Sequence, residues 1–219
     1  MSKRKGSRPQ ALRGPHDTPQ LAKPLRIIGG SMRGRGIQYS GDPRTRPMKD
    51  RLREAVFDVL ATAVVGKHAI DLFAGTGALA LEAISRRAAR ATLIERHFPS
   101  ARLIEQNIAS LGVGDRATVY AGDAFLWLKQ PHDWAKLQEL PWLVLCSPPY
   151  AFYVERTADM VGLINDLCQR APPDSEFVVE ADQRFDFALL AGLGAWDIRE
   201  YPPAVVGFHR IRPPASETR

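Results

Sequence analysis

Long apolar stretches and paired cysteines are both missing from this sequence. No segment of its 219 residues approaches the roughly 20 apolar residues that a membrane-spanning helix requires. The two cysteines, Cys146 and Cys168, have a spacing that fits neither a CxxC motif nor a disulfide framework. The five histidines form no HxxxH pair, so no metal site is predicted. These absences predict a soluble, cytoplasmic protein in a reducing compartment.

Apolar residues themselves are not scarce, because they make up 45% of the chain. That fraction can form a packed core, and the length suits one domain with an extension. Residues 1–24 differ, since they contain four prolines and few large apolar side chains. They have no apolar segment of the kind found in a secretory signal. We therefore expect residues 1–24 to form a disordered basic tail.

Basic residues are concentrated in the first quarter of the chain. Residues 1–53 carry 14 Lys and Arg against three Asp, whereas the rest of the chain holds 16 basic and 21 acidic residues. A basic segment on a mildly acidic body is typical of proteins that bind a phosphate-rich partner. The alternative is a solvated tail that serves only solubility.

Hydrophobic patterning predicts a small extension followed by a larger α/β domain. Short apolar segments at 26–28 and 36–40 predict a β-hairpin, and Pro47 opens a helix that reaches about residue 63. This extension occupies residues 25–65, and the main domain occupies residues 66–219.

In the main domain, strand-like and helix-like patterns alternate, which is typical of a parallel, doubly wound sheet. The last two strands, joined by Pro202-Pro203, predict an antiparallel hairpin at one edge. We expect a Rossmann-like sheet of seven strands, mostly parallel. The predicted strands are 68–74, 91–95, 117–121, 142–147, 176–181, 196–201 and 204–211, and the predicted helices are 78–87, 99–111, 124–129 and 154–169.

Two closely spaced glycines follow the first predicted strand, in the segment Asp71-Leu72-Phe73-Ala74-Gly75-Thr76-Gly77. At a strand-to-helix turn, glycines let backbone N–H groups approach a ligand without obstruction by a Cβ atom. Gly75-x-Gly77-x-x-Ala80, with Glu95 about 20 residues further on, also satisfies the dinucleotide fingerprint. A nicotinamide-dependent oxidoreductase therefore stays open beside an S-adenosylmethionine-dependent enzyme.

Three features favour S-adenosylmethionine. The Asp71 carboxylate would repel a pyrophosphate and attract a ligand that carries sulfonium and ammonium groups. Asp123, after the third predicted strand, can accept a hydrogen bond from an adenine amine, although aspartate there also suits the N-cap of the next helix. The segment Ser147-Pro148-Pro149-Tyr150, after the fourth predicted strand, has no use in hydride transfer.

This Ser-Pro-Pro-Tyr segment resembles the fourth motif of amino-methylating class I methyltransferases, (Asp/Asn/Ser)-Pro-Pro-(Tyr/Phe/Trp). Acceptors at Ser147 and the carbonyl of Pro148 would hold the hydrogens of an exocyclic base amine, and Tyr150 would stack on the base. Ser147, Pro148 and Tyr150 are therefore the predicted catalytic residues. An ordinary Pro-Pro turn is the alternative.

Motifs in the extension narrow the resemblance to one family. Arg26-Ile27-Ile28-Gly29-Gly30, Arg33-Gly34-Arg35 and Arg46-Pro47-x-x-Asp50-Arg51-x-Arg53-Glu54-x-x-Phe57 closely resemble the RsmD family. Those enzymes methylate the N2 amine of one guanine in bacterial small-subunit (16S) ribosomal RNA. The resemblance implies a seven-stranded fold, S-adenosylmethionine as the methyl donor, and the small ribosomal subunit as the partner. We expect the protein itself to be a monomer.

The motifs and the resemblance together assign two sets of binding residues. Glu95 is expected at the ribose hydroxyls of the donor and Asp123 at its adenine. Basic residues of the extension are expected to contact RNA, unless they pair with acids such as Asp50 or Glu54. The predicted donor pocket consists of Asp71, Phe73, Gly75, Gly77, Glu95, Asp123 and Ala124, and the predicted RNA contacts are Arg33, Arg35, Arg46, Arg51 and Arg53.

One residue departs from the family pattern. The family usually has Asp at the first position of the fourth motif, where this chain has Ser147. A hydroxyl carries no charge to offset the positive charge that develops on the attacking nitrogen, and charge-assisted hydrogen bonds are roughly twice as strong as neutral ones. Slower transfer, a different target base, and an RNA-binding module with a decayed site therefore all stay open.

Overall fold

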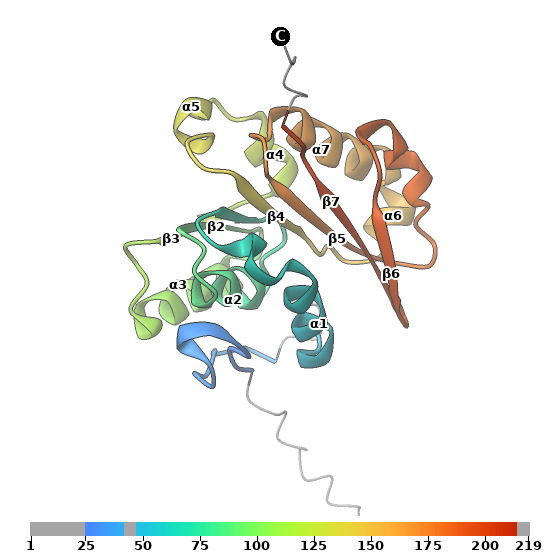
Figure 1. The fold of residues 1–219 in the computed structure, drawn as a ribbon. Helices are drawn as coiled ribbons and strands as arrows, with labels where there is room; N and C mark the ends of the chain where they lie inside the picture. Colours follow the sequence, from blue (N-terminus) through green and yellow to red (C-terminus); the bar gives the residue numbers. More distant parts are fainter. Residues whose placement is uncertain (1–24, 42–46, 214–219) are drawn as a thin grey trace, which may run out of the picture.

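The computed structural model describes residues 25–41 and 47–213, and its strands form one sheet in the order β3-β2-β1-β4-β5-β7-β6 (Figure 1). The first five strands pair in parallel, and β7 lies antiparallel between β5 and β6. This arrangement confirms the predicted mostly parallel sheet with an antiparallel C-terminal edge. The strands are β1 (His68–Asp71), β2 (Arg90–Glu95), β3 (Ala117–Ala121), β4 (Trp142–Cys146), β5 (Glu176–Asp182), β6 (Asp197–Tyr201) and β7 (Ala204–Arg210).

Helices cover both faces of the sheet, and each face has its own hydrophobic core. The first core contains side chains of α1 (Asp50–Leu60), α2 (Ala78–Ser85) and α3 (Phe98–Leu111). The second core contains side chains of the later helices and of the 3-10 segment η3. These helices are α4 (Ala124–Lys129), α5 (Trp134–Leu137), α6 (Phe152–Glu155), α7 (Thr157–Arg170) and η3 (Phe187–Leu193). No helix among the described residues has both the length and the apolar character needed to cross a membrane.

The two central strands are buried along their whole length. Every residue of β1 and of β4 is buried, as expected for parallel strands that are covered by helices on both faces. Apolar side chains suit this environment, but β1 ends with Asp71, whose carboxyl group is fully buried. A buried acid costs free energy unless it is paired, so its presence at the end of the central strand indicates a role beyond packing.

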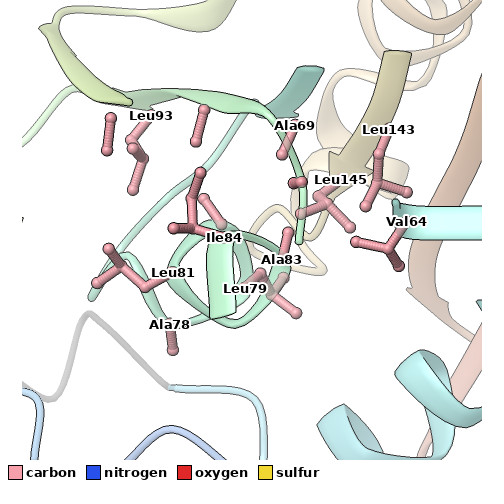
Figure 2. Close-up of a cluster of buried hydrophobic side chains, with 14 of the residues drawn as sticks. Val64, Ala69, Ala78, Leu79, Leu81, Ala83, Ile84, Leu93, Leu143 and Leu145 are labelled. Atoms are coloured by element: carbon pink, nitrogen blue, oxygen red, sulfur yellow. The ribbon is translucent and has the colours of Figure 1, made fainter. Parts of the chain in front are cut away.

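Helix α2 is the most deeply buried helix of the first core, with all eight of its residues buried (Figure 2). It begins after Gly77, which has a φ of 77°. A Cβ atom at Gly77 would lie 3.1 Å from side-chain atoms of both Leu93 and Ile104. Glycine is therefore required there both for the left-handed backbone and for the close approach of β2 and α3.

The extension forms the small antiparallel hairpin that the sequence predicted, and this hairpin is folded onto α2. Arg26 pairs with Gly36, and the N–H groups of Ile27 and Ile37 donate to the carbonyls of Arg35 and Leu25 at 2.9 and 2.8 Å. The 3-10 turn η1 (Gly30–Met32) lies between the two paired segments. Gly30 has a φ of 73°, and a Cβ atom there would lie 2.0 Å from the carbonyl oxygen of Ser85. Because the turn follows the surface of α2 so closely, its path is set by that helix as well as by the backbone pairing of the hairpin.

Some helix boundaries differ from the predicted ones. Helix α1 begins at Asp50 instead of Pro47 and is followed by the 3-10 segment η2 (Ala61–Val64). The predicted helix 154–169 is divided into α6 and α7 at Arg156, where φ is −136°. The patterns also missed α5 and η3, whose short lengths give no helical periodicity.

Candidate active site at the carboxyl edge of the sheet

The predicted site residues follow four neighbouring strands. Because β1, β2, β3 and β4 are parallel, their carboxyl ends meet at one edge of the sheet. The glycine loop follows β1, Glu95 ends β2, Asp123 follows β3, and Ser147 follows β4. In open α/β sheets, ligands bind at this edge. The fold therefore places the two predicted sets, donor residues and catalytic residues, at one location.

The glycine loop is held against β2 by Glu95. The backbone N–H of Gly75 donates to Glu95 Oε2 at 2.7 Å, and the N–H of His97 donates to Oε1 at 2.7 Å. Gly75 and Gly77 both have positive φ values, 55° and 77°. The carboxylate at the end of β2 therefore fixes the loop shape, and each of its oxygens keeps a further lone pair for a ligand.

Asp71 lies behind the glycine loop and is 0% exposed. Neither carboxylate oxygen has a hydrogen-bond partner of standard geometry among the described residues. Burial raises the pKa of Asp71 to about 7, and the backbone N–H groups of Ala80 and Phe73 offset this only in part. The structure buries this carboxylate completely, and its predicted place in the donor pocket stays a prediction.

Asp123 caps α4, as the alternative interpretation of the sequence allowed. Its Oδ1 accepts the N–H groups of Phe125 at 2.8 Å and Leu126 at 3.2 Å. Ala124, the first residue of the helix, is buried. Capping engages only one carboxylate oxygen, so the predicted adenine contact of Asp123 is compatible with this role and stays a prediction.

Three aromatic rings gather beside the glycine loop. Phe73, Phe125 and Phe152 have ring centroids between 6.0 and 6.4 Å apart. The Arg156 guanidinium lies 3.9 Å from the Phe125 centroid, and the Arg96 guanidinium lies 5.3 Å from that of Phe152. Sequence reasoning selected only Phe73. The signal for the other two rings was their position directly after Asp123-Ala124 and Tyr150-Ala151.

The Ser-Pro-Pro-Tyr segment is tied to β5 through Glu180, a residue that sequence reasoning missed. The Ser147 hydroxyl donates to Glu180 Oε2, and the Tyr150 hydroxyl donates to Oε1 at 2.7 Å. Glu180 is 6% exposed, and Pro148 is buried. Burial and the bond to Glu180 raise the pKa of Tyr150 well above its usual value. Tyr150 is therefore a neutral hydrogen-bond donor.

Cys146 precedes the catalytic segment on β4 and takes no part in its chemistry as a nucleophile. The side chain is buried, and burial raises the pKa of its thiol to about 12. Because only a thiolate is a good nucleophile, this cysteine is a packing residue.

The predicted RNA contacts fall into four groups, of which the buried Arg53 is the last. Arg33 and Arg51 are exposed. Arg35 is exposed but donates to the carbonyls of Ser110 and Leu111, where it caps α3. Arg46 and the tail 1–24 lie outside the described residues.

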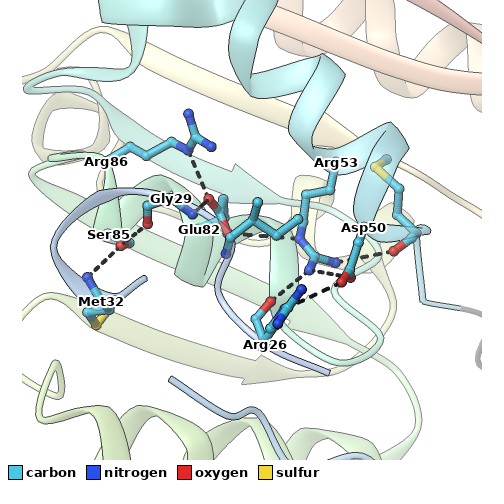
Figure 3. Close-up of polar contacts among 10 residues, drawn as sticks. Arg26, Gly29, Met32, Asp50, Arg53, Glu82, Ser85 and Arg86 are labelled. Carbon is cyan, nitrogen blue, oxygen red and sulfur yellow. Dashed lines mark hydrogen bonds and ion pairs between the residues drawn. The ribbon is translucent and has the colours of Figure 1, made fainter. Parts of the chain in front are cut away.

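The prediction for Arg53 is wrong. This side chain is 0% exposed and donates to the carbonyl of Arg26 at 2.8 Å and to Asp50 at 3.0 Å (Figure 3). Its Nε lies 3.9 Å from the buried carboxylate of Glu82. Arg53 therefore joins α1, the extension and α2, and its charge is used inside the protein.

Comparisons with known proteins agree with this architecture. Residues 25–199 match the family model described as Conserved hypothetical protein 95. The chain is similar to Ribosomal RNA small subunit methyltransferase D of Escherichia coli K12, with 40% identity over 129 residues. This match covers 58% of the chain and only 60% of that enzyme.

Two further comparisons extend over more of the chain. The enzyme of the same name from Haemophilus influenzae Rd is 29% identical over 169 residues, which cover 76% of this chain and 83% of that enzyme. A solved structure of a hypothetical protein from Thermus thermophilus superposes with a TM-score of 0.66 at 25% identity. It covers 85% of this chain and 99% of that chain. The chain therefore belongs to the Conserved hypothetical protein 95 family, the family of RsmD-like methyltransferases.

Proposed function

We propose that the protein is an S-adenosylmethionine-dependent methyltransferase that acts on small-subunit ribosomal RNA, at the exocyclic N2 amine of a guanine. The observation that carries this proposal is the meeting, at one sheet edge, of a glycine loop bound to Glu95 and a Ser-Pro-Pro-Tyr loop bound to Glu180. Membership in the RsmD-like family supports it. The guanine target rests on the family resemblance alone.

The residues beside the glycine loop fit the methyl donor. Asp71 is a buried carboxyl group without a hydrogen-bond partner among the described residues, which suits a cationic ligand better than a pyrophosphate. Glu95 carries free lone pairs beside the loop, as ribose hydroxyls require, and Asp123 has one carboxylate oxygen that the helix cap does not use. The Phe73 and Phe125 rings provide an apolar wall for the adenosyl group.

When bound, the donor supplies a methyl group, whose bond to sulfur breaks as its bond to the amine nitrogen forms, leaving a thioether. The described residues provide the geometry for this transfer. The hydroxyl of Ser147 and the carbonyls of the loop accept the hydrogens of the amine, and the two prolines limit movement of those acceptors. Tyr150 offers its ring to the base while its hydroxyl is held by Glu180. The nitrogen then releases its extra proton to water.

Exposed basic side chains of the extension are proposed to hold the RNA. Arg33 and Arg51 lie on the surface of the segment that packs on α2, the helix that follows the glycine loop. Arginine binds phosphate through paired hydrogen bonds, and such contacts position an RNA without reading its sequence.

Transfer of a labelled methyl group tests the proposal. Small subunits from a strain that lacks the modification are incubated with the protein and labelled donor, and the modified base is mapped. We expect label in one guanine of the small-subunit RNA. Label in adenine or cytosine would keep the enzyme class but overturn the guanine target, and RNA binding without transfer would identify a binding protein with an inactive site.

Thermal unfolding with added ligands separates the proposal from an oxidoreductase. S-adenosylhomocysteine should raise the melting temperature, because a ligand that binds only the folded state stabilises it. NAD should leave the melting temperature unchanged. The opposite pattern would contradict a methyl donor at this site.

A further inference from the structure

The carboxylate of Glu180 lies directly behind the catalytic loop. It accepts hydrogen bonds from Ser147 and Tyr150, the first and last residues of the Ser-Pro-Pro-Tyr segment. Glu180 projects from β5, which pairs in parallel with β4 in the register Cys146 to Val179. A neighbouring strand thus supplies the carboxyl group that the catalytic segment of this chain lacks.

No cation among the described residues is paired with Glu180. Its only hydrogen-bond partners there are the two hydroxyl groups, and the side chain is 6% exposed. A buried carboxylate that is compensated only by neutral donors attracts positive charge, and in a water-poor site this attraction is stronger than at a surface. The proposed reaction develops positive charge on a nitrogen beside Ser147.

The direction of the Ser147 hydrogen bond also determines what the hydroxyl can offer to a substrate. Its single proton is donated to Glu180, so the lone pairs of Oγ face away from that bond. An oxygen whose proton is held by a carboxylate is a better acceptor, because hydrogen bonds in a chain polarise one another. An exocyclic amine, which donates hydrogen bonds, would meet such an acceptor.

We propose that Glu180 is a positioning residue for base methylation: it fixes the Ser147 hydroxyl as an acceptor, holds the Tyr150 ring, and supplies the negative charge that an aspartate at position 147 would carry. The proposal rests on the proposed methyltransferase function. It explains how an active enzyme can carry serine at this position.

Kinetics of the Glu180→Gln variant test the proposal. Glutamine keeps the shape of the side chain but removes the charge. We expect kcat to fall at least tenfold, while KM for RNA and the affinity for S-adenosylhomocysteine stay within twofold. Adding Ser147→Asp to Glu180→Gln should restore kcat to within about threefold of the parent, since the charge returns at the catalytic segment.

Glu176→Gln is the matched control, because Glu176 is a buried glutamate on the same strand and contacts Arg210, outside the catalytic loop. Its kcat should equal that of the parent. The proposal is overturned if Glu180→Gln keeps kcat within twofold, if Ser147→Asp fails to rescue it, or if the control loses activity equally. A parent protein that transfers no methyl group would instead overturn the proposed function.

Difference infrared spectroscopy examines Glu180 without methyl transfer. The carboxylate band in the spectrum of the parent minus that of Glu180→Gln should shift when Ser147→Ala or Tyr150→Phe removes a donor. A band of a protonated carboxyl group, or a carboxylate band that neither variant moves, would contradict the assigned role.

Discussion

At the residue scale, Asp71 combines full burial with two carboxylate oxygens that have no hydrogen-bond partner of standard geometry among the described residues, and the backbone N–H groups of Ala80 and Phe73 offset its burial only in part. Burial disfavours the charged form, which is the reason for its pKa of about 7. Such a residue lowers the free energy of unfolding, so a requirement other than stability must account for its presence. Its place at the end of β1, beside the proposed donor pocket, indicates selection for binding.

Replacing Asp71 by Asn tests this cost. In the unfolded chain the carboxyl group has the ordinary aspartate pKa of 3.8, and in the folded protein its pKa is about 7. As pH rises between these values, only the unfolded state loses its proton, so the parent protein loses stability across that window. The asparagine side chain of Asp71→Asn cannot ionise. The free energy of unfolding of the variant, relative to that of the parent, should therefore rise across this pH window by on the order of 4 kcal/mol and then stay constant. Urea unfolding at about pH 5 and about pH 8 measures the difference, and an advantage independent of pH would contradict the assignment.

Glu95 makes a second residue-scale prediction. Glu95→Ala removes the acceptor of the Gly75 and His97 N–H groups and the proposed ribose acceptor. An unpaired buried donor costs on the order of 1–3 kcal/mol, so affinity for S-adenosylhomocysteine should fall tenfold or more. Calorimetric titration measures it. RNA affinity should not change, and Glu105→Ala, an exposed glutamate on α3, is the matched control. If the affinity of Glu95→Ala for S-adenosylhomocysteine stays within twofold of that of the parent, the predicted contact of Glu95 with the ribose is wrong.

Residues inside short motifs were largely predictable, because their position after a strand determines where they lie. Glu95, Gly75 and Ser147 reach the predicted edge for this reason. Glu180 was not predictable, since it belongs to a strand without a motif and meets Ser147 only through sheet pairing. Arg53 was predicted to contact RNA, with pairing to an acid such as Asp50 as the alternative, and the structure shows that pairing inside the protein.

At the element scale, the extension is fastened to α2 through one buried acid. Glu82 accepts the N–H groups of Ile28 and Gly29, both at 2.7 Å, and pairs with Arg86 and Arg53. Ser85 adds a bond to the carbonyl of Gly29 and accepts the N–H of Met32 (Figure 3). These contacts attach the paired segments of the extension to the helix.

Breaking this cluster should destabilise the protein. Arg53→Met removes a buried guanidinium from Glu82, Asp50 and two carbonyls, and the loss of one partner from a buried pair costs about 3 kcal/mol or more. Urea unfolding should show this decrease. The same substitution at the exposed Arg51 on the same helix should change stability by less than about 0.5 kcal/mol. Equal effects would mean that Arg53 has no special structural role.

Most strands were predicted within one to three residues, because buried parallel strands have continuous apolar sequences. Two short elements, α5 and η3, were missed, although the six residues of α4 were predicted with their observed bounds. The hairpin of the extension was predicted, but its attachment to α2 was not, because its backbone groups bond to side chains of a helix more than 50 residues away. Local patterns contain no information about such partners.

At the scale of the whole molecule, charge is distributed unevenly. Residues 1–24 carry six Lys and Arg against one Asp, and the exposed Arg33 and Arg51 belong to the neighbouring extension. The rest of the chain, beyond residue 53, carries a small net negative charge. An RNA is therefore expected to approach from the basic end.

Removal of residues 1–24 should weaken RNA binding and reduce its dependence on salt. Each phosphate contact contributes a slope of roughly 0.7–0.9 in log affinity against log salt concentration, so the slope should decrease by several units. Fluorescence anisotropy at a series of salt concentrations measures this. Affinity for S-adenosylhomocysteine should be unchanged. An unchanged slope would show that the tail is only a solvated appendage.

Helix α2 also has an energetic consequence. Its first residue follows Gly77 of the glycine loop, and its last turn carries Ser85 and lies next to Arg86, where the extension is attached. If a ligand at one end displaces this helix, the free energy of binding at the other end changes. Thermodynamic linkage then requires reciprocity: whatever factor RNA imposes on the affinity for the donor, the donor imposes on the affinity for RNA. The eight buried residues of α2 connect the proposed donor site to the proposed RNA-binding extension, so any coupling that this helix transmits acts equally in both directions.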